Sequence, residues 1–375
     1  MNKKYLNILL LLPLVFSSCK NKEDNTDDLK EETPQEEVVI HLEEPKDGEI
    51  KEIPKINIHT KVQQAFFNDS IDNVNLYARG VEELSRPVSP TFTWDGGNNK
   101  HTVYISENAD YSDSKIYEVN KSEVSLTNLK IDTTYYFKAV SSNIAVYETS
   151  FTTSDEIIRN VYVSGVTNVR DLGGYKVGEN KLKQGLIYRT GRLNQNSTET
   201  VTNKINANGI KTMLEDLKVK SEIDLREVSN NEVGGLNEPV GVLGDSVRYY
   251  QCPMDYTNLT SELNRDSVKK VFEILGNKEN YPTFFHCSIG TDRTGYIAWL
   301  INAYLGVSEE NLYRDYLFSN FGNIGGSRSV SSISGGYVSQ INALEGDSLS
   351  EKSKNHLLSL GVNESDLNTL KEMML

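Results

Sequence analysis

The chain of 375 residues has only three cysteines and five histidines, and it lacks an excess of positive charge. Cys19, Cys252 and Cys287 make neither a disulfide framework nor a clustered metal-ligand motif. Because the histidines are scattered, a zinc site is not expected either. The net charge of −14 argues against a nucleic-acid partner, which would need a basic footprint. We therefore expect no metal, no other cofactor and no nucleic acid.

Residues 1–19 have the pattern of a targeting segment. Two lysines precede the apolar stretch Tyr5–Phe16, which is too short to span a bilayer comfortably, and two serines precede Cys19. The pattern resembles a bacterial lipoprotein signal peptide. That resemblance implies lipidation of Cys19 and a lipid-anchored protein of the bacterial cell envelope, at the outer membrane, facing the periplasm or the surface. The alternative is a plain signal peptide with an incidental cysteine.

The next two segments differ sharply in composition. Residues 20–53 are acidic and lack apolar periodicity, so we expect a disordered, solvated tether. Residues 54–153 contain short runs of β-branched and aromatic residues, such as Thr91–Trp94 and Tyr135–Val140, separated by turn residues. Short strands at this spacing predict an all-β sandwich.

The end of the predicted sandwich resembles a fibronectin type III module. Leu129, Thr133 and Tyr135 stand where that family has a leucine, a threonine and the tyrosine of its corner, although Ile131 replaces the usual proline. The resemblance implies that Trp94 is the buried core tryptophan. Since no residue in this segment suggests chemistry, we expect a spacer or docking module.

Residues 155–375 alternate short apolar runs with helical patterns, which predicts an α/β domain with a central sheet flanked by helices. Ser221–Arg226 and Thr283–Phe285 are expected to include strands, and Lys211–Leu214 is a further candidate strand. Thr198–Asn208 is expected to be a helix that Gly209 terminates.

The motif His286–Gly295 reads HCSIGTDRTG and lies between a predicted buried strand and a predicted buried helix. The first turn of a helix leaves backbone N–H groups unpaired and positively polarised, so this loop can wrap its amides around a phosphate. The Arg293 guanidinium matches two phosphate oxygens, and the same positive field favours the Cys287 thiolate as a nucleophile. The predicted phosphate-binding residues are Ser288, Ile289, Gly290, Thr291, Asp292 and Arg293.

This motif is similar to the signature of cysteine-dependent phosphatases: His-Cys, five residues, Arg, then Ser or Thr. With Asn168–Tyr175, Tyr188–Leu193 and Ile223–Arg226, it makes residues 155–375 resemble the bacterial tyrosine-phosphatase-like family. The resemblance implies a phosphatase of the protein-tyrosine-phosphatase type that forms a cysteinyl-phosphate and needs no metal. Thr291 stands where many members have lysine, which favours phosphotyrosine or another phosphomonoester over lipid substrates.

Two other functions stay open for this domain. One is an inositol-polyphosphate or phosphoinositide phosphatase, and the other is a non-catalytic lipoprotein that binds phosphorylated ligands. The presence of both Cys287 and Arg293 argues against the non-catalytic function. The expected partner is therefore a phosphorylated protein or a small phosphomonoester.

Three aspartates are candidates for the general acid that protonates the leaving oxygen. Asp292 lies inside the loop and is favoured by the family resemblance. Asp255 lies 287 − 255 = 32 residues before the cysteine, an offset similar to that of the acid in dual-specificity phosphatases. Asp224 ends a predicted strand. The structural alternatives are a helix cap for Asp292, a turn residue for Asp255 and an arginine partner for Asp224.

The remaining candidates support the site. His286 is expected to orient the loop and to help keep the cysteine ionised, and Thr294 could donate a hydrogen bond to its sulfur. Arg170 and Asp171 are expected to buttress the site, with direct substrate contact as the alternative. Cys252 is expected to be a core residue, with a redox partner of the catalytic cysteine as the alternative.

Overall fold

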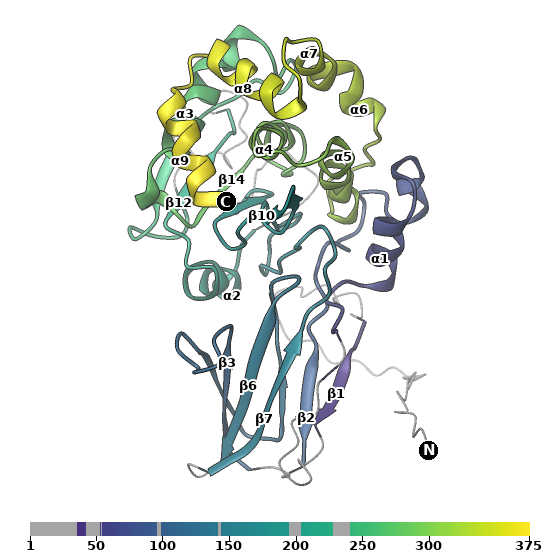
Figure 1. Ribbon diagram of the computed structural model, residues 1–375, viewed down its shortest axis with the longest axis vertical. Coiled ribbons are helices and arrows are strands. Elements are labelled where there is room, and N and C mark those ends of the chain that lie inside the picture. Colours follow the sequence, from purple (N-terminus) through teal and green to yellow (C-terminus); the bar gives the residue numbers. More distant parts are fainter. Residues whose placement is uncertain are drawn as a thin grey trace, which may run out of the picture. The chain divides into compact units, whose positions relative to one another are not determined.

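The computed structural model describes residues 36–42, 53, 55–95, 99–141, 144–194, 204–227 and 241–375. The predicted signal segment and Cys19 lie outside the described residues. Residues 36–375 form one compact unit, which contains a β-sandwich and an α/β domain (Figure 1). Among the described residues, none of the helices has both the length and the apolar character that a bilayer crossing requires.

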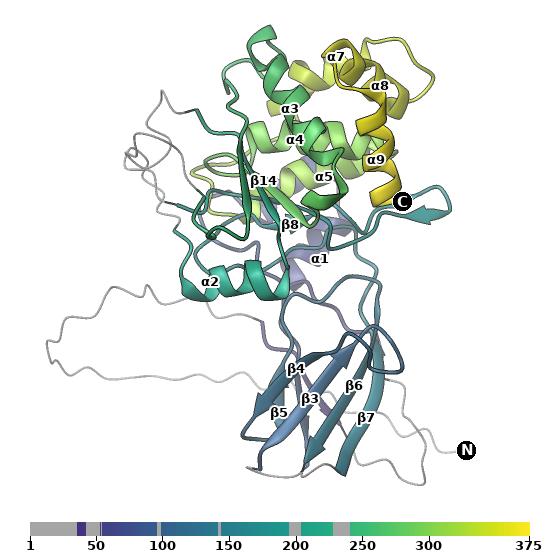
Figure 2. The ribbon, with the colours of Figure 1, turned by 90° about the vertical axis from the view of Figure 1, so that its left-hand side faces the viewer.

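The β-sandwich has a three-stranded and a four-stranded sheet, and Figure 2 shows the second of them. The first sheet has the order β1-β2-β5, with β1 at Val39–Leu42, β2 at Thr91–Trp94 and β5 at Glu123–Ser125. The second has the order β4-β3-β6-β7, with β3 at His101–Ser106, β4 at Lys115–Val119, β6 at Thr134–Ser141 and β7 at Ile144–Thr152.

Aromatic side chains from both sheets fill the space between them. The Phe92 ring of β2 lies 5.3 Å from the Phe137 ring of β6 and 4.8 Å from the Phe151 ring of β7. Trp94 is buried in the same cluster. The Tyr135 hydroxyl accepts a hydrogen bond of 2.8 Å from the backbone N–H of Lys130, which is the arrangement of a tyrosine corner.

Two segments depart from the predicted domain organisation. Val39–Leu42 lies inside the expected tether but forms β1, which pairs in parallel with β2 and buries Leu42 in the sandwich core. The expectation of a disordered tether is therefore wrong for these residues. Helix α1 at Lys61–Asn68 and the 3-10 helix η1 at Ile71–Leu76 lie inside the segment predicted to be all-β.

The helical segment around α1 belongs to the core of the α/β domain and not to the sandwich. Phe66, Phe67 and Val74 pack in that core, where the Phe67 ring stacks on the Phe318 ring at 5.9 Å. Arg314 donates hydrogen bonds of 2.8 Å to the carbonyl of Phe66 and 2.7 Å to that of Asp69. A stretch inserted between β1 and β2 thus completes the α/β domain.

The central sheet of the α/β domain has the strand order β13-β12-β14-β11-β8. The four strands from β13 to β11 are parallel, and β8 is an antiparallel edge strand. These strands are β8 at Arg170–Asp171, β11 at Ile187–Thr190, β12 at Ser221–Asp224, β13 at Arg248–Gln251 and β14 at Thr283–His286. A separate hairpin joins β9 at Lys176–Val177 to β10 at Asn180–Lys181.

Helices cover both faces of this sheet, as the α/β prediction requires. On one face pack α3 at Arg265–Leu275, α4 at Asp292–Tyr304, α5 at Glu309–Phe318, α8 at Leu349–Ser359 and α9 at Glu364–Met374. On the other lie α2 at Ala207–Lys211 and η2 at Thr212–Asp216 (Figures 1 and 2). Shorter helical pieces are η3 at Glu262–Asn264, η4 at Lys278–Asn280, η5 at Ser319–Phe321, α6 at Ser331–Ile333, η6 at Ser334–Val338 and α7 at Ser339–Asn342.

One predicted strand is wrong. Lys211–Leu214 is helical, and Met213 from this stretch packs against the sheet beside Phe284. Gly209 does not terminate a helix but lies inside α2. The helix passes so close to the Ser164 carbonyl oxygen that a Cβ at residue 209 would lie 2.2 Å from it. Most of the expected helix Thr198–Asn208 lies outside the described residues.

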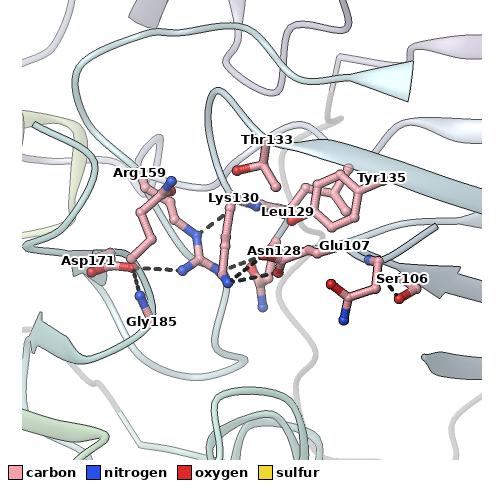
Figure 3. Close-up of polar contacts among 12 residues, drawn as sticks. Ser106, Glu107, Asn128, Leu129, Lys130, Thr133, Tyr135, Arg159, Asp171 and Gly185 are labelled. Atoms are coloured by element: carbon pink, nitrogen blue, oxygen red, sulfur yellow. Dashed lines mark hydrogen bonds and ion pairs between the residues drawn. The ribbon is translucent and has the colours of Figure 1, made fainter. Parts of the chain in front are cut away.

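A buried arginine links the sandwich to the α/β domain (Figure 3). Arg159 makes an ion pair of 2.7 Å with Asp171 of β8. Its guanidinium also donates to the carbonyls of Asn128, at 2.8 Å, and Leu129, at 3.3 Å, both in the turn before β6. One guanidinium therefore bridges a strand of the central sheet and a turn of the sandwich.

Candidate active site

The motif loop lies where the C-terminal ends of the parallel strands meet. Cys287 follows β14 directly, is 2% exposed and is not in a disulfide, and α4 begins at Asp292. Loops at this edge of an open α/β sheet are a common place for ligand binding. Gly290 has a φ of +72°, and a Cβ on it would lie 2.4 Å from the Thr190 carbonyl oxygen. The internal glycine therefore lets the loop turn tightly against the end of β11.

Side chains hold the loop through its carbonyl groups. Asn168 Nδ2 donates to the carbonyls of Ile289, at 3.1 Å, and Gly290, at 3.0 Å. Arg189 of β11 donates to the Gly290 carbonyl at 2.7 Å. Because the C=O and N–H of a trans peptide point in opposite directions, these contacts turn the following amides to the other side of the loop. That side is then lined with donors for an oxyanion.

A buried ion-pair network fixes Asn168 and Arg189. The Asp315 carboxylate lies 2.5 Å from Arg189 Nη1 and 2.8 Å from Arg170 Nε, and all of these side chains are buried. Arg170 also donates to the side-chain oxygen of Asn168. Burial alone would raise the pKa of the Asp315 carboxyl, but the two guanidinium groups hold it below its ordinary value. Among the described residues, Arg170 is thus linked to the loop through Asp315 and Asn168.

Asp171 differs from its expected role. Its carboxylate accepts hydrogen bonds from the backbone N–H of Gly173, at 2.8 Å, and of Gly185, at 2.6 Å, in addition to pairing with Arg159. None of these partners belongs to the motif loop. Asp171 therefore organises the junction with the sandwich rather than the motif loop.

His286 is fully buried between the sheet and the loop. One ring nitrogen lies 3.0 Å from Glu222 Oε1, and the other lies 3.1 Å from the Cys287 carbonyl oxygen and 3.9 Å from Asp224 Oδ1. Burial raises the pKa of the Glu222 carboxyl, although its contact with His286 opposes this effect. The imidazole therefore contacts the peptide that carries Cys287.

Asp224 is held as an ion. Arg226 contacts both carboxylate oxygens, at 2.9 Å and 2.6 Å, and the Tyr249 hydroxyl donates at 2.8 Å. Burial opposes ionisation, but His286 and Arg226 lower the pKa of Asp224 to about 2. Both carboxylate oxygens are therefore already bound and the side chain is fully buried, so the alternative of an arginine partner describes Asp224 better.

Asp292 is also engaged by an arginine. Arg328 lies 3.2 Å from one carboxylate oxygen and 3.0 Å from the other, and the Tyr316 hydroxyl donates to the first at 3.3 Å. The carboxylate lies in the first turn of α4, where the helix dipole favours negative charge. Through Arg328, Asp292 therefore connects the motif loop to the segment before α6.

Asp255 lies in the loop after β13. Its side chain accepts hydrogen bonds from the N–H of Thr257, at 2.8 Å, and from its hydroxyl, at 2.7 Å. These donors, with a smaller effect of the Arg293 charge, hold the pKa of Asp255 below its ordinary value. Asp255 is partly exposed, and the Arg293 charge acts on its carboxyl. Among the described residues, it is the only one of the three aspartates to which no basic side chain is bonded.

Arg293 is 4% exposed and lies between the ends of two strands. Its Nη1 donates to the carbonyls of Leu225 and Met254, both at 3.3 Å. The Thr294 hydroxyl is buried and has no hydrogen-bond partner among the described residues, so the predicted bond to the sulfur is not formed here. Burial raises the pKa of Cys252 to about 12, as expected for a core thiol.

The residues that hold the loop and its histidine from behind are not apparent from the sequence. Asn168 and Arg189 stand out only as parts of the family motifs, and Asp315 and Glu222 belong to none of them. A charged residue inside a fully buried strand, such as Arg189 in β11 or Glu222 in β12, is the signal that points to two of them. In the part of the chain that the structure describes, no group of three or more His, Cys, Asp or Glu residues could hold a metal ion.

Residues 161–333 match the family described as "Tyrosine phosphatase family". Two similar proteins are both named putative tyrosine-protein phosphatase OCA1. The protein from Scheffersomyces stipitis is 28% identical over 149 residues, which cover 37% of this chain and 66% of that protein. The protein from Debaryomyces hansenii is 39% identical over 67 residues, which cover 16% of this chain and 33% of that protein. The chain thus spans less than two thirds of the length of either relative.

The solved structures that align with part of this chain include two of Siw14. The core catalytic domain of the PP-IP phosphatase SIW14 from S. cerevisiae, in complex with citrate, aligns with a TM-score of 0.30 and 19% identity, over 47% of this chain and 93% of that chain. The other Siw14 catalytic core aligns with a TM-score of 0.28 and 19% identity, over 53% of this chain and 95% of that chain.

Proposed function

We propose that this chain, which carries a tyrosine phosphatase family domain at residues 161–333, hydrolyses phosphomonoesters through a cysteinyl-phosphate intermediate. The domain is that of a phosphoric monoester hydrolase. The observation that carries the proposal is the motif loop, whose carbonyls are held from outside by Asn168 and Arg189 while Cys287 stands at its start. Amides turned inward next to a cysteine form a site for phosphoryl transfer.

In the first step, the Cys287 thiolate attacks phosphorus in line with the ester oxygen. An S–P bond forms while the P–O bond to the leaving group breaks, and the leaving oxygen takes a proton from a carboxylic acid. Arg293 and the loop amides stabilise the charge on the three equatorial oxygens. In the second step, water attacks phosphorus, the S–P bond breaks and the thiolate returns with inorganic phosphate as the product.

We assign the general-acid role to Asp255 in preference to Asp292. Arg328 already contacts both oxygens of Asp292, so a proton there would compete with an ion pair. Asp255 follows Met254, whose carbonyl accepts a hydrogen bond from the phosphate-binding Arg293. This places the Asp255 loop next to the position where phosphorus would be bound.

The Asp255→Asn variant is expected to lose the fall of kcat/KM at higher pH, because a general acid acts in its protonated form. Since the pKa of Asp255 lies below its ordinary value, the wild-type optimum should be on the acid side of neutral. Turnover of phosphotyrosine should fall by about 10²- to 10⁴-fold. Turnover of 2,4-dinitrophenyl phosphate should fall much less, because its leaving group needs no proton.

The matched control is Asp292→Asn, measured over the same pH range with both substrates. It should keep the descending limb and show no dependence on the leaving group beyond that of the wild type. A descending limb that disappears in Asp292→Asn and persists in Asp255→Asn would return the role to Asp292.

We further propose phosphotyrosine in proteins as the substrate, because Thr291 adds no cationic side chain to the loop. The test compares a phosphotyrosyl peptide, para-nitrophenyl phosphate and inositol hexakisphosphate, with Cys287→Ser as the blank. Preference for inositol hexakisphosphate would identify the alternative substrate class. Absence of Cys287-dependent turnover, together with retained binding of phosphorylated ligands, would identify a binding lipoprotein.

We also infer that the sandwich is a fibronectin type III-like spacer or docking module. Its support is the pairing of a three-stranded with a four-stranded sheet, the buried Trp94 and the corner made by Tyr135. The parallel pairing of β1 with β2 is a departure, because sandwiches of this kind are built from antiparallel strands.

Lipid anchoring at Cys19 is proposed from the sequence pattern of residues 1–19. Expressed in a bacterium, the chain with residues 1–19 is expected to fractionate with membranes, and Cys19→Ser is expected to release it into the soluble fraction. The measurement is the distribution of the protein between washed membranes and supernatant. Unchanged membrane association of the variant would contradict a lipid anchor at this cysteine.

A further inference from the structure

One large aromatic side chain lies exposed next to the phosphate-binding arginine. The Tyr256 side chain is 55% exposed, and its ring centroid lies 5.6 Å from the guanidinium carbon of Arg293. Arg293 itself is almost fully buried. The tyrosine therefore contacts the arginine on one side and solvent on the other, at the point where a substrate would approach.

The loop that carries this tyrosine is closed by a buried asparagine. Asn264 accepts a hydrogen bond of 2.7 Å from the N–H of Asp255 and donates one of 2.9 Å to its carbonyl. Its amide also donates to the carbonyls of Asn258 and Leu259, both at 3.2 Å. The backbone before and after Tyr256 is thus fixed by side-chain contacts, although the ring faces solvent.

We propose that Tyr256 forms one wall of the substrate entrance and gives the enzyme a preference for aryl over alkyl phosphate monoesters. This inference rests on the proposed phosphatase function and specifies its substrate class. In an aryl phosphate a single ester oxygen separates the ring from phosphorus. When Arg293 binds the phosphate, the substrate's ring is therefore held near the Tyr256 ring.

The expected size of the preference follows from aromatic pairing. Offset-stacked or edge-to-face rings with centroids 4.5–7 Å apart contribute about 0.5–1.5 kcal/mol, which corresponds to about 2- to 13-fold in kcat/KM. An alkyl ester offers no ring, so it gains none of this contribution. The same geometry fits a tyrosyl phosphate and disfavours a seryl phosphate.

The experiment compares kcat/KM for two peptides of one sequence, phosphorylated on tyrosine or on serine, in the wild type, Tyr256→Phe, Tyr256→Leu and Tyr256→Ala. The tyrosine-to-serine ratio should be kept in Tyr256→Phe and should fall about 2- to 13-fold in the leucine and alanine variants. The inhibition constant of inorganic phosphate is measured in every variant, because the Tyr256 ring contacts Arg293. A change in phosphate binding would affect both peptides alike and would cancel in the ratio. Leu263→Ala is the matched control, since Leu263 is 78% exposed in the adjacent η3 and lacks a ring.

A tyrosine-to-serine ratio that stays constant in Tyr256→Leu and Tyr256→Ala would overturn the proposal. If kcat/KM also fell equally for both peptides, the constant ratio would instead indicate displacement of Asp255. A ratio that fell equally in Leu263→Ala would assign the effect to the loop as a whole. Failure of the phosphatase function itself is distinguishable, because neither peptide would then be hydrolysed in a Cys287-dependent manner.

Discussion

Replacement of Cys287 by serine is expected to lower phosphate release from every ester by about 10⁴-fold or more. A serine hydroxyl is scarcely ionised near neutral pH, so no anionic nucleophile stands at the start of the loop. The exchange of sulfur for oxygen is small, and the contacts that fix the loop come from Asn168 and Arg189. The variant should therefore still fold and bind inorganic phosphate, which calorimetry can measure beside the rate of phosphate release.

Cys252→Ala serves as the control for this prediction. Cys252 is also buried and is not in a disulfide, but burial raises its pKa to about 12. Turnover per folded molecule should therefore stay close to that of the wild type. If Cys287→Ser retained more than about one hundredth of the wild-type rate, a cysteinyl-phosphate would not be an obligatory intermediate.

Removal of the residues before 155 is expected to prevent the α/β domain from folding, although the family match begins only at residue 161. The deletion would take Phe66 and Phe67 out of the core, together with the carbonyls that satisfy the buried Arg314. Each large-to-small change at a buried phenylalanine costs about 3–5 kcal/mol, against a total stability of about 5–15 kcal/mol. The truncated chain should show no cooperative unfolding in urea and no near-ultraviolet circular dichroism.

Point variants in the full chain separate the loss of phenylalanine packing from other effects of truncation. Phe66→Ala should lower the free energy of unfolding by about 3–5 kcal/mol. Leu76→Ala is the control within the same segment, because Leu76 is 76% exposed, and it should change stability by less than about 0.5 kcal/mol. A chain starting at 155 that unfolded at the same urea concentration as the full chain would contradict the contribution of α1.

The same segment also reaches the back of the active site. Glu83 accepts hydrogen bonds from the Thr167 hydroxyl and, at 3.4 Å, from the backbone N–H of Asn323. Thr167 precedes Asn168, which holds the loop carbonyls. Residues between the first two strands of the sandwich therefore support both the core and the motif loop of the α/β domain.

The motif loop could be predicted from the sequence because its information is local. A short apolar strand, the residues His286–Gly295 and a buried helix follow one another within one stretch, and the structure places β14, the loop and α4 there. The role of α1 could not be predicted in this way. A helical stretch between two strands carries no local sign of which of two cores its phenylalanines join.

The different roles of neighbouring residues could not be predicted from the sequence either, because they depend on contacts with distant parts of the chain. Arg170 and Asp171 were both expected behind the loop, but successive side chains of a strand point to opposite sides. In β8 one of them faces Asp315 and Asn168, and the other faces Arg159. Likewise, the family resemblance favours Asp292 over Asp255, because the sequence does not show that Arg328, 36 residues after Asp292, returns to contact it.

The Arg159 bridge limits how this protein can be re-engineered. An exchange of the sandwich for an unrelated module would leave the guanidinium without the carbonyls of Asn128 and Leu129, although its ion pair with Asp171 would remain. A chimera would have to reproduce that turn before β6, or replace Arg159 and Asp171 together with neutral residues of similar volume, because an uncompensated buried charge is costly. The border between the two modules is therefore a poor place for a recombination crossover.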